Sequence, residues 1–159
     1  MTETYLDIME DSLRKKIEVM QQIEIQNGIQ KKALERPEGP DQDAFDEAVR
    51  VKGDLIGKVT ELNDGFAGLY DKIKNELDDN KDKYRDQITR MQNLIRQVTD
   101  LSNTIEVQEV RNKKLIDSYF SNSKISVKSS KQSAAVSSDY RTTMNKSAGA
   151  QSHFVDSQS

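Results

Sequence analysis

Residues that could carry out acid–base, nucleophilic or metal chemistry are scarce in this sequence. It contains no Cys and a single His, His153, which lies far from the apolar, periodic part of the chain. A histidine-based triad, a zinc site or a di-iron site built on Glu-x-x-His pairs therefore cannot form on those segments. The seven glycines also lack the spacing of a phosphate-binding loop. We expect no enzyme, no metal site and no cofactor.

The charged residue with the most informative position is Lys52. It occupies a core position in an apolar heptad repeat, and a buried ammonium without a counter-ion is costly. Antiparallel packing of the predicted helices places Lys52 near Glu106 and Glu109, so we expect it to pair with Glu109, or failing that with Glu106. Such a pair could fix the register of the helices, or it could mark a loosened end that opens a groove for a helical peptide.

The helix that must position Lys52 spans residues 42–77. Its core positions repeat every seven residues, in two interleaved series. The first series is Phe45, Lys52, Val59, Phe66 and Ile73, and the second is Ala48, Leu55, Leu62 and Leu69. Val49, Ile56, Tyr70 and Leu77 widen the apolar face beyond what a two-stranded coiled coil uses. A face this wide predicts that two further helices cover it.

Two neighbouring segments supply those helices, at about residues 3–35 and 81–119. Pro37 and the pair Gly39-Pro40 end the first helix, and a weaker break is expected at 78–81. The stripe of the first helix is apolar apart from the polar interruptions Lys16, Asn27 and Gln30. The predicted fold is therefore all-α: an antiparallel three-helix bundle of long, coiled-coil-like helices over residues 1–120. Without the second break, the last two helices would form one rod that needs a dimer partner, so both a monomer and a homodimer are open.

The composition changes after residue 120. About a third of residues 121–159 are Ser, and the apolar residues become isolated, which is typical of a disordered tail with a few anchors such as Tyr140 and Phe154. The tail carries five Lys or Arg against two Asp, too sparse for a nucleic-acid interface. No apolar run approaches the 18 residues of a membrane span, so we expect a cytoplasmic protein that does not insert into membranes.

Surplus apolar residues near the polar part of the bundle predict a partner-binding surface. The third helix becomes polar around Gln108 and Asn112, and the apolar residues nearby have few predicted internal partners. The candidate residues are Ile25, Ile29, Asn112, Leu115, Ile116, Tyr119 and Phe120. An amphipathic helix could dock its apolar face there. For Ile25 and Ile29, burial by a slight rotation of the first helix is the alternative.

Several stretches together resemble a known family. They are the opening YLDIMEDSLRKK, the segment DQDAFDEAVRVKGDLIGKVTELNDGF and the end VQEVRNKKLIDSYF. Over most of residues 3–120 the sequence resembles the FlgN family of flagellar type III export chaperones. The resemblance is carried mainly by Lys52, Leu55, Leu62 and the run from Asn112 to Leu115. The FliT-type flagellar chaperones share this size and architecture.

The resemblance implies a cytoplasmic chaperone. Its partners would be the C-terminal helices of the hook-filament junction proteins, which it would hold and deliver to a component of the export gate. The competing hypothesis is a structural coiled-coil adaptor that spaces or dimerises partners without chaperone activity. A compact monomer favours the chaperone, and an elongated obligate dimer favours the adaptor.

Overall fold

A computed structural model of the protein describes residues 1–122 and 124–156. These residues form four helices: α1 (Thr2–Leu34), α2 (Gln42–Asp79), α3 (Arg85–Ser121) and α4 (Val127–Asp156). The described part of the chain contains no strand, which confirms the all-α class. The predicted number of three helices is wrong, because most of the expected tail forms α4. The side chain of His153 is not among those described.

The breaks between the first three helices follow from local sequence. After α1, the turn passes through Gly39 at φ +109°, a backbone conformation that favours glycine. Asp41 then caps α2, since its side chain accepts a hydrogen bond from the backbone N–H of Ala44 at 3.1 Å. Between α2 and α3 the break lies at residues 80–84, a few residues later than expected.

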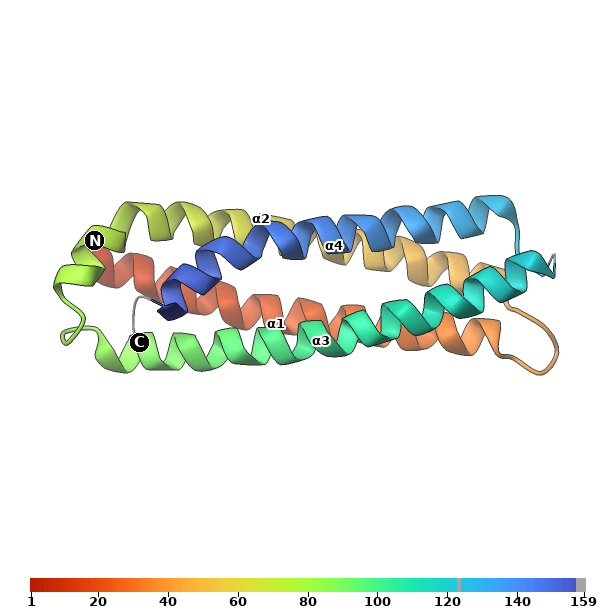
Figure 1. Cartoon of the computed structure of the whole chain (residues 1–159), viewed down its shortest axis with the longest axis horizontal. Coiled ribbons are helices and arrows are strands. Elements are labelled where there is room, and N and C mark those ends of the chain that lie inside the picture. Colours follow the sequence, from red (N-terminus) through yellow and green to blue (C-terminus); the bar gives the residue numbers. More distant parts are fainter. Residues whose placement is uncertain (123, 157–159) are drawn as a thin grey trace.

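The four helices lie side by side in an elongated bundle (Figure 1). Within the described residues, α1 packs against α2 and α3, and α4 packs against the other side of the same two helices. This leaves α1 diagonally opposite α4, and α2 diagonally opposite α3. Helix α1 is antiparallel to α2, as predicted, and α4 returns along the bundle from the end of α3 (Figure 1).

Helix α4 corrects the expectation of a disordered tail. Its buried residues recur at intervals of three, four or seven positions, which place them on one helix face. They are Ile125 just before the helix, then Ser129, Ser133, Tyr140, Thr143, Ser147, Gln151 and Phe154. Many are small or polar, so the segment reads as Ser-rich although its period is helical. Ser126 caps the helix by accepting a hydrogen bond from the N–H of Ser129 at 3.0 Å. The wide apolar face of α2 gives this face something to pack against.

The core consists of three apolar clusters along the bundle. The first cluster, near the α2–α3 loop, includes Leu6, Met9, Leu13, Phe66, Tyr70, Ile73, Ile88, Ile95 and Phe154. The middle cluster is Met20, Ile23, Ile56, Val59, Val98, Ile105 and Tyr140. The third cluster is Ala33, Leu34, Phe45, Val49, Ile116 and Ile125. Burying a side chain of this kind stabilises the fold by about 1.5–3 kcal/mol. Buried polar residues occupy the intervals between the clusters.

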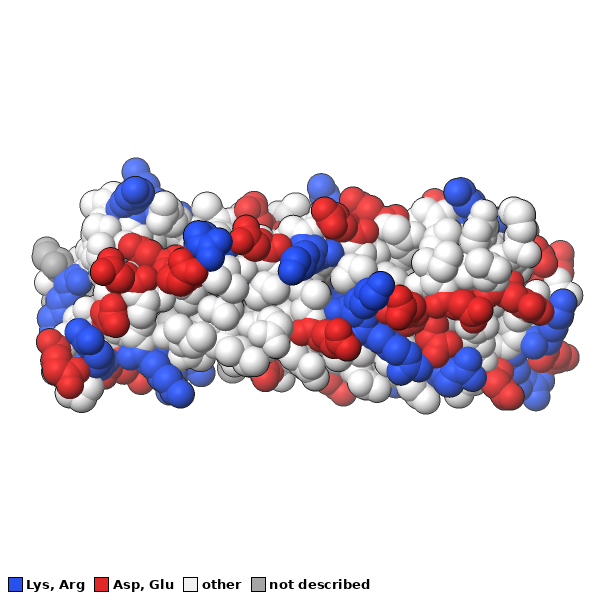
Figure 2. Space-filling model, turned by 180° about the vertical axis from the view of Figure 1, so that it is seen from behind, with Lys and Arg blue, Asp and Glu red and all other residues white. Residues whose placement is uncertain are grey.

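The outer surface carries mixed charge. On the face seen in Figure 2, Lys and Arg side chains lie among Asp and Glu side chains along the whole length of the molecule. Several charged surface residues pair one helical turn apart, as Lys15 does with Asp11 at 3.0 Å and Arg50 with Asp54 at 3.1 Å. Such exposed pairs contribute little to stability, about 0–1 kcal/mol each.

Candidate partner-binding site

The predicted ion pair between Lys52 and Glu109 is confirmed. The Lys52 side chain is 1% exposed, and its Nζ forms an ion pair with the Glu109 carboxylate across the core from α2 to α3. Nζ also donates a hydrogen bond to Oε1 of Gln30 at 3.4 Å. Burial lowers the pKa of Lys52, and the negative charge of Glu109 opposes this effect. The ammonium is thus buried with a counter-ion.

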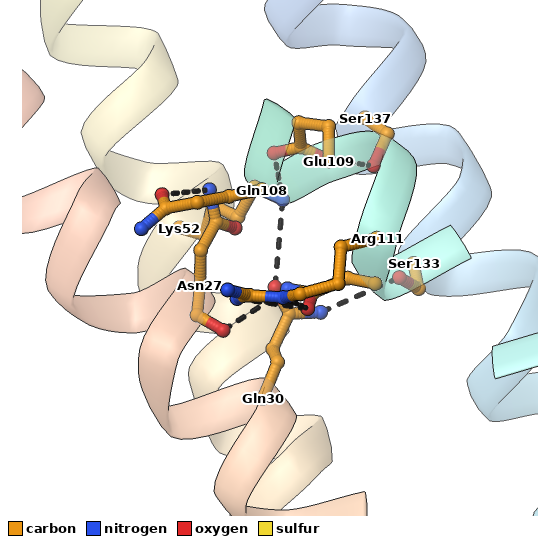
Figure 3. Close-up of polar contacts among 9 residues, drawn as sticks. Asn27, Gln30, Lys52, Gln108, Glu109, Arg111, Ser133 and Ser137 are labelled. Atoms are coloured by element: carbon orange, nitrogen blue, oxygen red, sulfur yellow. Dashed lines mark hydrogen bonds and ion pairs between the residues drawn. The ribbon is translucent and has the colours of Figure 1, made fainter. Parts of the chain in front are cut away.

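A network of polar residues surrounds this ion pair (Figure 3). The Ser137 hydroxyl on α4 donates a hydrogen bond to Oε2 of Glu109 at 2.6 Å, and Gln30 donates to the Ser133 hydroxyl at 3.5 Å. We call the whole group the Lys52 layer, and it lies between the middle and third clusters. Its members are Asn27, Gln30, Lys52, Gln108, Glu109, Asn112, Ser133 and Ser137.

Asn112, one of the predicted partner-binding residues, belongs to this layer. It is 2% exposed, and its Nδ2 donates a hydrogen bond to the backbone carbonyl of Asn27 at 3.0 Å. Asn27 in turn donates from Nδ2 to Oε1 of Gln108 at 3.1 Å. Asn112 therefore tethers α3 to α1 inside the bundle rather than facing a partner.

Three further predicted residues lie in or against the third cluster. Ile116 is buried there, and Leu115 and Tyr119 pack against it while remaining partly exposed. The third cluster also contains Ile125, which directly precedes α4. The expected shortage of internal partners is thus wrong for these residues, because the segment read as a tail covers them.

The remaining predicted residues are exposed. Ile25 is 51% exposed, Ile29 is 39% exposed and Phe120 is 40% exposed, and none of the three apolar clusters includes them. The slight rotation of the first helix that would bury Ile25 and Ile29 does not occur. The predicted surface is therefore split into a part that α4 covers and a part that remains open to solvent.

The interface between α3 and α4 is incompletely filled. A cavity of about 420 Å³ lies beside the Lys52 layer, where its walls include Glu109 and Ile116 of α3 and Ser133 and Tyr140 of α4. A second hollow of about 390 Å³ continues along the same two helices, past Val98 and Ser147. Both hollows are partly open to solvent, and α4 contacts α3 less than any other neighbouring pair of helices in the described residues.

A second group of buried polar residues separates the first and middle clusters. Lys16 lies in α1 between Leu13 and Met20, and it is 2% exposed. Asn63 of α2 is 8% exposed and lies between Val59 of the middle cluster and Phe66 of the first, and Ser147 of α4 is 7% exposed and lies between the cluster members Met144 and Phe154. We call these three residues the Lys16 layer. Among the described residues, Lys16 Nζ and both side-chain atoms Nδ2 and Oδ1 of Asn63 have no hydrogen-bond partner.

Burial also perturbs titration in this part of the bundle. It lowers the pKa of Lys16 to about 8, with no nearby carboxylate to oppose the effect. It raises the pKa of Tyr140, in the middle cluster, to about 12. Burial disfavours the charged form in both cases, the ammonium of Lys16 and the phenolate of Tyr140.

Comparison with protein-family models, with curated proteins and with solved structures gives no match. Within residues 1–122 and 124–156, no group of three or more His, Asp or Glu side chains is arranged to hold a metal ion. In the same part of the chain, no helix is both long enough and apolar enough to cross a membrane.

Sequence reasoning missed two features of this site. It did not recognise that the segment after α3 forms a helix that covers the bundle, although Ile125, Tyr140 and Phe154 fall on one helical face together with the buried serines. It also treated Lys16 only as an interruption of an apolar stripe. The cost of burying an unpaired ammonium, which predicts a counter-ion for Lys52, applies equally to Lys16.

Proposed function

We propose that the protein is a chaperone for helical segments, and that an amphipathic client helix takes the place of α4 on α2 and α3. The observation that carries the proposal is the incompletely filled interface between α3 and α4. Its cavity of about 420 Å³ reaches Ile116, at the centre of the predicted partner-binding surface. A helix with larger apolar side chains would fill this space and gain contacts that α4 does not make.

The composition of α4 supports the exchange. Where α2 buries Phe45 and Val49, the facing side of α4 buries Ser129 and Ser133. A serine buries little apolar surface, whereas a Leu, Ile or Phe contributes about 1.5–3 kcal/mol on full burial. The start of α4 is thus held by less apolar contact than the part that Tyr140 and Phe154 anchor, and a more apolar helix from another protein could compete with it there.

The resemblance to the FlgN family suggests what the client is. On this proposal the protein is a cytoplasmic factor in the assembly of the bacterial flagellum. It would bind the C-terminal helices of the hook-filament junction proteins and deliver them to a component of the type III export gate. Such helices are amphipathic, so they match the binding mode in which an apolar helix face docks in a groove.

An adaptor function is less well supported. A coiled-coil adaptor would leave an apolar seam for a second chain, whereas here Ile56, Phe66 and Tyr70 of α2 are buried within a single chain. Size-exclusion chromatography with light scattering checks this reasoning. A compact monomer is the expected result, and an elongated obligate dimer would favour the adaptor.

The test is a change of the predicted surface. Changing Leu115 and Tyr119 together to Ser should weaken the binding of a peptide copied from the C-terminal helix of the host's hook-filament junction protein at least tenfold, about 1.4 kcal/mol. From residue 124 onward, the described members of the third cluster are Ile125, which precedes α4, and Val136 of α4, so a client helix with larger apolar side chains should lose more contacts than α4 does. Fluorescence anisotropy measures the affinity.

The matched control is Val107→Ser on the same helix. Val107 is 70% exposed and does not line the cavity, so this variant should bind the peptide as the unchanged protein does. Circular dichroism should show the same helical content for all three proteins. Undiminished binding by a folded Leu115→Ser, Tyr119→Ser variant would place the client elsewhere.

A further inference from the structure

Lys16 is a buried cation without a counter-ion. Its side chain is 2% exposed, and its Nζ has no hydrogen-bond or ion-pair partner among the described residues. Leaving one charge buried and unpaired costs several kcal/mol, about 3–5 kcal/mol when it results from removal of a partner. A lysine at this position is therefore unfavourable for the fold as it stands, and its presence calls for an explanation.

The charged groups around Lys16 are already engaged or face solvent. Glu10 on α1 binds Arg90 at 3.1 Å and Arg14 at 2.6 Å. Glu61 and Asp64 on α2 and Asp100 on α3 are exposed. On α4, residues 140–155 include no Asp or Glu. None of the four helices thus supplies the carboxylate that Lys16 lacks.

A counter-ion for Lys16 would have to be carried by whichever helix occupies the position of α4. The Thr60 hydroxyl on α2 lies 2.9 Å from that of Thr143 on α4, and the Phe66 ring centroid lies 6.0 Å from that of Phe154. These contacts set the level of α4 against α2. Asn63 lies between Thr60 and Phe66, and Ser147 lies between Thr143 and Phe154, so the covering helix meets the Lys16 layer at Ser147.

We propose that Lys16 and Asn63 select client helices that carry an Asp or Glu at the level of Ser147. Lys16 Nζ and Asn63 Nδ2 are donors that lack an acceptor, and Asn63 Oδ1 is an acceptor that lacks a donor in the described structure. A carboxylate can accept from both donors, and its charge matches the ammonium. The inference rests on the proposed function, because the client helix must occupy the place of α4. It adds a rule of specificity: a helix with an apolar residue at this level leaves the ammonium unpaired.

The two buried lysines explain why this role falls to Lys16. Lys52 receives its carboxylate from Glu109 of α3, which stays in place whichever helix covers the bundle. Lys16 receives nothing from α1, α2 or α3. Helix α4 contributes the hydroxyls of Ser133 and Ser137 to the Lys52 layer, but not its counter-ion. In the Lys16 layer the fourth helix would have to supply the counter-ion itself.

The first test places a carboxylate on α4 of the full-length protein. S147E, K16M and the double variant form a double-mutant cycle, with unfolding in urea as the readout. We expect S147E to be more favourable beside Lys16 than beside the K16M substitution by at least tenfold in the folding equilibrium constant, about 1.4 kcal/mol. The neutral control S147Q should show no such coupling. If S147E has the same effect in both backgrounds, Lys16 does not accept a carboxylate from this position.

The second test uses the junction-protein peptide of the preceding section. Each Asp or Glu of the peptide is changed in turn to Asn or Gln, and affinity is measured on the unchanged protein and on K16M. We expect one change to weaken binding at least tenfold on the unchanged protein and to have little effect on K16M. Coupling of no acidic residue to K16M would overturn the selection rule while leaving the chaperone function standing. Failure of the peptide to bind either protein would instead overturn the chaperone function.

Discussion

The described part of the bundle contains two polar layers, each built around a buried lysine. The lysine has a counter-ion in one layer and none in the other. In the Lys52 layer, Glu109 of α3 neutralises the ammonium. Lys52 also donates a hydrogen bond to Gln30, and Ser137 donates one to Glu109. In the Lys16 layer, the ammonium and the Asn63 amide have no partner among the described residues. The layer with its own carboxylate stabilises the bundle by itself. The layer without one is incomplete until another molecule supplies the charge.

Buried polar groups with partners and buried polar groups without partners have different effects on the fold. A satisfied pair can specify register at modest net cost, because wrong registers leave its charges unpaired. An unsatisfied donor set destabilises the present fold but favours whatever acceptor completes it. On this view the Lys52 layer fixes how α1, α2 and α3 align, and the Lys16 layer acts on the choice of the fourth helix.

The largest expected change in stability comes from removing the Lys52–Glu109 ion pair. Changing Glu109 to Ala leaves Lys52 buried without a counter-ion, so the free energy of unfolding should fall by about 3–5 kcal/mol. Urea unfolding followed by circular dichroism measures the loss. Glu106 is exposed one turn away on the same helix, and its change to Ala is the control. Equal, small losses for the two variants would mean that the ion pair contributes nothing to the fold.

Raising the pH above 8 should increase the free energy of unfolding, because Lys16 in the folded protein then loses its unpaired charge. The pKa of Lys16 is about 8 in the folded state against 10.5 in its ordinary state, so the unfolded state binds more protons between these values. Stability should therefore rise from pH 8 toward pH 10, by up to about 3 kcal/mol. The lowered pKa of Lys52 acts in the same direction. The raised pKa of Tyr140, about 12, opposes the gain above pH 10, where the unfolded tyrosine ionises first.

Urea midpoints measured at intervals from pH 7 to pH 10 test this expectation. In K16M most of the rise should disappear, because the remaining lysine of the core has its counter-ion. A rise of the same size in K16M would assign the effect to another group.

Replacing Lys16 by Met should stabilise the protein at pH 7 by about 2 kcal/mol, because it removes an unpaired buried charge and keeps an unbranched side chain of similar length. The neighbouring Lys15 pairs with Asp11 on the surface, so Lys15→Met should change stability by less than about 0.5 kcal/mol. Thermal unfolding of the two variants makes the comparison. A K16M protein that is less stable than the unchanged one would show that the lysine is satisfied after all.

The smallest effect is expected from Asn63→Asp, which gives the Lys16 layer a carboxylate of its own. The new pair should contribute about 1 kcal/mol at pH 7. It should also raise the pKa of Lys16 and so abolish the alkaline gain in stability. Asn63→Leu, which adds no charge, should keep that gain. Persistence of the gain in the Asn63→Asp variant would indicate that the two side chains do not meet.

The first three helices could be predicted because heptad spacing and strong breaks leave little freedom. Pro37 and Gly39-Pro40 forbid a helix, and the repeat of α2 assigns Lys52 to the core, where an antiparallel neighbour supplies Glu109. These expectations required only local geometry and the cost of a buried charge.

Helix α4 could not be predicted from composition. Serine has a weak helix propensity and is typical of disordered segments, so a Ser-rich stretch shows little preference for helix by itself. The wide apolar face of α2 provides the surface on which the segment orders, through residues such as Tyr140 and Phe154. The prediction of the partner-binding surface was partly wrong for the same reason, because the segment that covers part of it was expected to be disordered.

The central claim is that α4 stands where a client helix binds, and hydrogen–deuterium exchange tests it most directly. The exchange of backbone amides is compared for the full-length protein alone and with a saturating amount of the junction-protein peptide. We expect the amides of α4 (Val127–Asp156) to lose protection when the peptide binds, while those of α1 (Thr2–Leu34) and α2 (Gln42–Asp79) keep theirs. Bound peptide together with a fully protected α4 would contradict the account.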